Sequence, residues 1–125
     1  MKKLRLLLCV SLLASSVAYA NVEATLESIN NEMQALEIKE KQKFKLEEEK
    51  AKQSETKYNT FVAESEIVNT KILELESSLE QSFYPEEQKA LLNSYKSISK
   101  ELKVAISDEG QKIEEFNQLK QILGY

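Results

Sequence analysis

The chain has 125 residues, a formal net charge of −4, two glycines, one proline and one cysteine, and it lacks histidine and tryptophan. So few glycines and prolines leave little chain for turns, and the composition therefore predicts a single all-α domain of long helices. Without histidine, and with Cys9 in a segment that we expect to be removed, cysteine or histidine metal sites and nucleophile–histidine pairs are excluded.

Residues 1–20 have the three parts of a secretory signal peptide. A basic start precedes an apolar stretch at residues 6–14, which is too short to span a bilayer, and Ala18 and Ala20 are small residues of the kind that a signal peptidase reads. We expect cleavage between Ala20 and Asn21 and export to the outer membrane, the cell surface or the medium. A lipoprotein signal at Cys9 is disfavoured because Leu8 stands where a small residue is needed. A retained anchor is the other alternative, and contact with a membrane is otherwise expected only through the uncleaved signal.

The mature chain, residues 21–125, is more acidic than the whole. Removal of Lys2, Lys3 and Arg5 leaves 14 basic residues against 21 acidic ones, a formal charge of −7. An acidic surface repels phosphate backbones, so we do not expect nucleic-acid binding.

A long first helix is predicted over about residues 22–82. Apolar residues recur there three and four positions apart, with no glycine or proline between them, which is typical of a helix that packs against another helix. Between Lys39 and Lys57 charges of both signs are interleaved. We favour a solvated face with ion pairs along the helix over a binding patch.

The long helical pattern is interrupted at Ser82, Phe83, Tyr84 and Pro85. Proline fits the first position of a helix and disfavours helical geometry in the residue before it. Glu86 and Glu87 then fall in a first turn, where carboxylates meet the positive end of the helix dipole. We expect a tight hairpin turn here rather than a kink in one continuous helix, because the apolar stripes on both sides need a partner.

A second helix is predicted over about residues 85–122, ending at Gly124. Gly110 lies in its middle, where we expect a tolerated weak point rather than a functional hinge. Folded back as an antiparallel two-helix hairpin, a coiled-coil-like rod, it pairs Leu91 with Leu75 and Ile98 with Val68. The predicted core of this hairpin comprises Tyr58, Phe61, Val68, Ile72, Leu75, Leu79, Tyr95, Ile98, Leu102 and Ile106.

The first helix is predicted to be longer than the second, so its beginning should lie beyond the reach of the returning helix. That segment carries apolar residues at heptad spacing, a pattern that needs a partner. It either frays, pairs with its counterpart in a dimer, or packs against the end of another hairpin and propagates into a filament. The five residues are Val22, Leu26, Ile29, Met33 and Leu36.

The exported helical pattern, the Phe83-Tyr84 turn and the downstream residues Leu91, Tyr95, Leu102, Ile113 and Phe116 resemble the FadA adhesin family, as does the spacing from Phe44 to Phe83. The resemblance covers residues 21–125. It implies a surface-exposed hairpin, the adhesin domain, that polymerises head to tail through an apolar chain and binds host cells through cadherin-type receptors. It places this chain of contacts on Val22, Leu26, Ile29 and Leu36 at one end and on Leu91 at the other.

The sequence departs from the family in two respects. Val22, Ile29 and Met33 are apolar without being leucine, a change that packing of similar volume tolerates. The middle of the first helix is richer in lysine and glutamate, which bears on receptor choice because the charged faces select the partner.

The predicted function is therefore an exported adhesin subunit that associates with itself and with a host-cell surface protein. A periplasmic holdase-type chaperone is the alternative, but the chain is acidic and lacks a separate trimerising β segment. No cofactor, metal or catalytic residue is expected, because two helices enclose no pocket that would raise a carboxylate pKa.

Overall fold

A computed structural model describes residues 19–125 and consists of helices. Helix α2 spans Tyr19–Ser78, a short 3-10 helix η1 spans Leu79–Gln81, and α3 spans Pro85–Leu123. No strand occurs among the described residues. The predicted all-α hairpin with a longer first helix is thus confirmed, with 60 residues in α2 and 39 in α3. Residues 1–18 of the predicted signal peptide, including Cys9 and Ala18, lie outside the described part of the chain.

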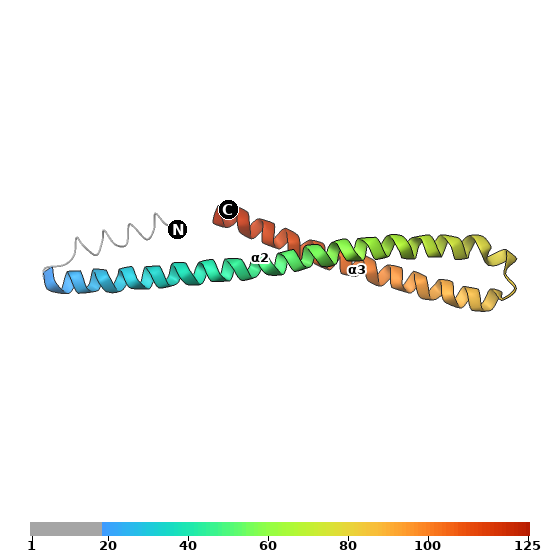
Figure 1. The fold of residues 1–125 in the computed structure, drawn as a ribbon, viewed down its shortest axis with the longest axis horizontal. Helices are drawn as coiled ribbons and strands as arrows, with labels where there is room; N and C mark the ends of the chain where they lie inside the picture. Colours follow the sequence, from blue (N-terminus) through green and yellow to red (C-terminus); the bar gives the residue numbers. More distant parts are fainter. Residues whose placement is uncertain (1–18) are drawn as a thin grey trace. The chain divides into compact units, whose positions relative to one another are not determined.

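The chain divides into two compact units, Met1–Lys45 and Leu46–Tyr125. The first is described from Tyr19 onward and consists of the beginning of α2. The second contains the hairpin, in which α3 folds back along the later part of α2 (Figure 1).

The helix boundaries differ by a few residues from those predicted. The helix α2 begins at Tyr19 and passes through the expected cleavage bond between Ala20 and Asn21. Its α-helical part ends at Ser78, where η1 tightens the last turn, instead of reaching residue 82. The hydroxyls of Ser77 and Ser78 both donate to the carbonyl of Glu74 at 2.9 Å, and such bonds compete with the regular backbone pattern.

Residues 82–84 form the turn between the helices, and Pro85 is the first residue of α3. The backbone N–H of Tyr84 donates to Ser82 Oγ at 3.0 Å, and the N–H of Gln88 donates to the Tyr84 carbonyl at 3.0 Å. No residue of the described turn needs a cis bond or a positive φ. Proline therefore starts α3 as its fixed φ predicts, with Glu86 and Glu87 in the first turn.

The side chain of Gln88 ties the two helices together next to the turn. Its Nε2 donates to the backbone carbonyl of Leu75 at 3.1 Å and to Ser78 Oγ at 2.7 Å. The last carbonyls of a helix have no partner within the helix. A residue of α3 thus caps the end of α2.

At its other end α3 stops at Gly124, which has a left-handed φ of 76°. The N–H of Gly124 donates to the Gln121 carbonyl at 3.3 Å, and that of Tyr125 to the Lys120 carbonyl at 3.0 Å. Glycine adopts this conformation without the penalty of a Cβ, so it terminates the helix in a defined place.

Candidate assembly and binding surface

The two helices of the unit Leu46–Tyr125 meet along a narrow strip, here called the hairpin core. Its members alternate three and four residues apart on each helix, the spacing of side chains that interlock between paired helices. Its buried members are Ala51, Ser54 and Val68 on α2 and Leu92, Ser99, Leu102 and Glu109 on α3. Half-buried members include Tyr58, Phe61, Ile72, Leu75, Leu79, Tyr95, Ile106, Ile113 and Phe116. No described side chain is completely buried, as expected for two helices without a third layer.

The core carries polar groups that sequence reasoning missed. Ser99 Oγ donates to Asn69 Oδ1 at 3.2 Å, across the two helices. Ser54 and Glu109 are each 7% exposed, as deep as the apolar residues around them. Polar residues give no apolar signal in the sequence, and only the phase of the heptad, read from Leu92, Tyr95 and Leu102, points to position 99.

Glu109 is a buried carboxylate that forms an ion pair with Lys112. Lys112 Nζ donates to its Oε1 at 3.0 Å, whereas Oε2 is buried and has no hydrogen-bond partner among the described residues. The neighbouring Ser54 hydroxyl, followed by Lys112, holds the pKa of Glu109 below its ordinary value of 4.5. The group is therefore a charged member of the core at neutral pH.

Ile98 does not belong to the hairpin core, contrary to the prediction. Its side chain is 43% exposed, and the adjacent Ser99 is the buried residue at that level. The heptad that runs through Leu92, Tyr95 and Leu102 places Ser99 toward α2 and Ile98 at its edge. The other residues predicted for the core are all buried or half-buried.

The charged residues on α2 pair mostly along the helix. Lys50 and Glu47 lie 2.9 Å apart, Lys52 and Glu48 lie 3.6 Å apart. These pairs are exposed, and surface pairs of this kind contribute little to stability. Ion pairs along a single helix are what we expect of a solvated helix face, the interpretation favoured for the segment between Lys39 and Lys57.

One ion pair joins the two helices along an edge of the core. Lys96 Nζ lies 2.9 Å from Glu76 Oε1, and both side chains are partly exposed. A second pair, Lys71 with Glu74 at 3.0 Å, lies along α2 and raises the pKa of Lys71 through the hydrogen bond with Glu74.

The residues predicted for self-assembly lie in both units. In the unit Met1–Lys45, Val22, Leu26, Ile29 and Met33 are half-buried and share one face of α2, while Leu36 is 46% exposed. In the unit Leu46–Tyr125, Leu91 is 50% exposed on α3.

The hairpin turn presents aromatic side chains to solvent. Phe83 is 96% exposed and Tyr84 is 70% exposed. Aromatic rings so exposed contribute little to the packing of their own unit, and aromatic residues are enriched at protein–protein contacts.

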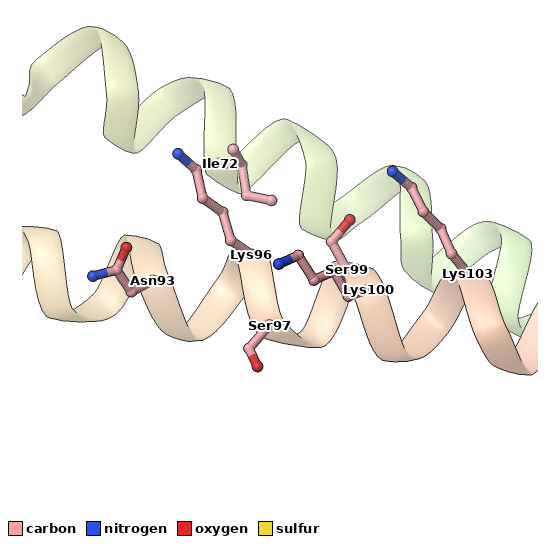
Figure 2. A pocket seen from close by; sticks show the side chains of 7 residues that line it. All are labelled: Ile72, Asn93, Lys96, Ser97, Ser99, Lys100 and Lys103. Carbon is pink, nitrogen blue, oxygen red and sulfur yellow. The ribbon is translucent and has the colours of Figure 1, made fainter.

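A shallow groove of about 450 Å³ lies at the edge of the hairpin core that carries the Lys96–Glu76 pair. Figure 2 shows Lys96, Lys100 and Lys103 on α3 around it, with Ile72 contributed by α2. Asn93, Ser97 and Ser99 complete the lining.

Neither a metal centre nor a membrane span is found in the part of the chain that the structure describes. No group of three or more acidic, cysteine or histidine side chains could hold a metal ion there. The helices within residues 19–125 contain no stretch long and apolar enough to cross a bilayer.

A comparison with protein families returns one match that covers most of the chain. The family described as adhesion protein FadA matches residues 25–123, a range that includes the whole of α3, the turn and nearly all of α2. No curated protein and no solved structure matches the chain significantly. With its paired helices, aromatic turn and a family match over most of its length, this chain belongs to the FadA adhesion protein family.

Proposed function

We propose that this chain is an exported bacterial adhesin subunit that assembles with copies of itself and, in assembled form, binds a protein on the host-cell surface. Membership of an adhesion family supports adhesion as the function and a surface or secreted location. Assembly, export and the receptor are the parts that this proposal adds.

The observation that carries the assembly step is the apolar face of residues 22–36. Val22, Leu26, Ile29 and Met33 recur at heptad spacing on α2, as in a helix that packs against another helix. At a rise of about 1.5 Å per residue, α2 is roughly 90 Å long and α3 roughly 60 Å. The shorter helix cannot match the full length of the longer one, so a second chain is the natural partner for this face.

We infer that the partner is the turn end of another hairpin, which offers exposed Leu91, Phe83 and Tyr84. The contact joins different surfaces of the two copies. Contacts of this type do not close on themselves and therefore produce filaments. A dimer through residues 22–36 of two copies would instead stop at two chains.

Sedimentation velocity at about 0.15 M salt, where the screening length is about 8 Å, on the full chain produced in a host that exports it tests this step. We expect a series of species that grow with protein concentration, and a shift toward the smallest species for Ile29→Asn. The control variant Ser28→Asn introduces the same side chain at the exposed neighbouring position and should sediment like the unchanged chain. A single species that does not change with concentration or with Ile29→Asn would refute assembly through this face, and a limit at two chains would refute the filament.

The host partner in this proposal is a receptor of the cadherin type that the family resemblance implies. The middle of α2 is richer in lysine and glutamate than the family resemblance leads us to expect, and charge arrangement governs partner choice more than affinity. Binding of the purified chain to cells with and without such a receptor tests this part separately from assembly.

A further inference from the structure

The two flanks of α3 carry charges of opposite sign. On α3, Lys96 and Lys103 come directly after the core residues Tyr95 and Leu102, so they lie on one flank of the core. Leu91 and Ile98 come directly before the core residues Leu92 and Ser99, so they lie on the opposite flank. Between residues 87 and 108 the first, here called the basic flank, carries Lys89, Lys96, Lys100 and Lys103. The second, the acidic flank, carries Glu87, Glu101 and Asp108.

Most of these charges have no partner within the described part of the chain. Lys96 pairs with Glu76 across the helices, but Lys100 and Lys103 form no ion pair with another described residue. The same holds for Glu101 and Asp108 on the acidic flank. Lys112, a cation on the acidic side, is held by Glu109 at 3.0 Å.

Each flank also has an apolar feature. The acidic flank bears a ridge of Leu91, 50% exposed, and Ile98, 43% exposed, seven residues apart. The basic flank bears the groove of about 450 Å³, with Ile72 in its lining and Lys96, Lys100 and Lys103 around it (Figure 2). An apolar side chain beside a carboxylate fits a groove with an apolar wall and ammonium groups.

We propose that the acidic flank of one hairpin docks on the basic flank of a second copy, with Ile98 entering the groove and Glu101 and Asp108 meeting Lys100 and Lys103. On α3 the groove is lined by side chains from Asn93 to Lys103 that lie on the basic flank, and Ile98 lies at the middle of this stretch on the opposite flank. The two hairpins therefore lie side by side, parallel and in register.

This contact is distinct from the head-to-tail contact proposed above, because it involves α3 and not residues 22–36. It leaves the basic flank of one copy and the acidic flank of the other open, so the contact repeats and hairpins stack laterally. Exposed charges supply much of its attraction, so the association should weaken as salt rises.

The test uses two charge-reversed versions of the full chain, both carrying Ile29→Asn so that head-to-tail assembly does not contribute. One has Lys100→Glu with Lys103→Glu, and the other has Glu101→Lys with Asp108→Lys. Sedimentation velocity at roughly 0.01 M salt, where the screening length is about 30 Å, measures association. Helix content from circular dichroism checks that each version is folded.

We expect the Ile29→Asn chain to associate and each reversed version to associate at least about tenfold more weakly, since attraction becomes repulsion in two pairs. An equimolar mixture of the two reversed versions should recover association, because the basic flank of the first version, now carrying glutamates, meets the acidic flank of the second, now carrying lysines. Lys43→Glu with Lys45→Glu changes the net charge as much as Lys100→Glu with Lys103→Glu, at exposed positions on α2, and should leave association unchanged.

The proposal is overturned if the Ile29→Asn chain does not associate, if either reversed version associates like its parent, or if the mixture does not recover association. Equal weakening by the Lys43 and Lys45 changes would also overturn it, because net charge and not the flanks would then be responsible. None of these results affects the head-to-tail contact, which is measured in chains that retain Ile29.

Discussion

Gly110→Ala should stabilise the hairpin. Glycine in the interior of a helix costs about 1 kcal/mol relative to alanine, because it loses more backbone freedom on folding. Gly110 lies within α3, which continues through it, and it does not have a positive φ. A Cβ placed there would lie 3.5 Å from Cε2 and 3.9 Å from Cδ2 of Tyr58, which is ordinary van der Waals contact.

The helix gain is therefore not offset by a clash, and the added methyl group gains contact with the Tyr58 ring. We expect the free energy of unfolding to rise by about 1 kcal/mol, and the Tm to rise by roughly 4–8 °C for a unit of this size. Thermal unfolding followed by circular dichroism measures the change. Because association raises the apparent Tm with concentration, the comparison should be made in the Ile29→Asn chain at several concentrations.

Gly124→Ala is the matched control, because the same change at a φ of 76° strains the backbone and should lower stability by roughly 1 kcal/mol. An unchanged or lowered Tm for Gly110→Ala would refute the placement of Gly110 against Tyr58 at ordinary contact distance. It would favour a functional hinge at Gly110.

Three further predictions concern the hairpin core and the turn. Leu102→Ala should cost about 2–4 kcal/mol, measured by urea unfolding, whereas the same change at exposed Val104 should cost less than about 0.5 kcal/mol. Because the pKa of Glu109 is lowered, its charge stabilises the fold above pH 4.5, and this contribution is lost as the pH falls through the pKa of the folded state. The free energy of unfolding of Glu109→Gln should therefore fall less on acidification than that of the unchanged chain. Gln88→Ala should cost about 0.5–1.5 kcal/mol, because the Leu75 carbonyl loses its cap, and an unchanged unfolding midpoint would count against that bond.

The fold could be predicted because its determinants are local and periodic. A single proline, with a non-helical residue before it and two glutamates after it, marks the start of α3 at Pro85. The apolar repeat on both sides then requires an antiparallel pairing. The end of α2 was less predictable, because it depends on serine hydroxyls that bond back to the Glu74 carbonyl and on Gln88, ten or more residues away.

The core was harder to assign than the fold, because polar residues occupy some of its positions. Ile98 is the larger and more apolar neighbour of Ser99, and hydrophobicity favours it for the core. The phase of the heptad nevertheless places Ser99 inside, where it bonds Asn69. Glu109 was missed for the same reason, because no pattern of apolar residues indicates a buried carboxylate.

The function could be approached only in part from the physics of the chain. Periodicity predicts that apolar residues at 22–36 need a partner, but it does not say what the chain binds. Adhesion follows from the family match over residues 25–123. Receptor choice depends on the arrangement of exposed charges, and a single sequence contains no record of the surface that those charges meet.

The most direct test of an adhesin that works in assembled form is cell binding by the full chain, Ile29→Asn and Ser28→Asn, on cells with and without a cadherin-type receptor. Assembly presents many binding sites at once, and such multivalency strengthens binding without any new contact. We expect the full chain and Ser28→Asn to bind alike to receptor-bearing cells, and Ile29→Asn to bind at least about tenfold more weakly. Equal binding by all three chains would contradict a role for assembly in adhesion, and no binding to either kind of cell would contradict adhesion through such a receptor.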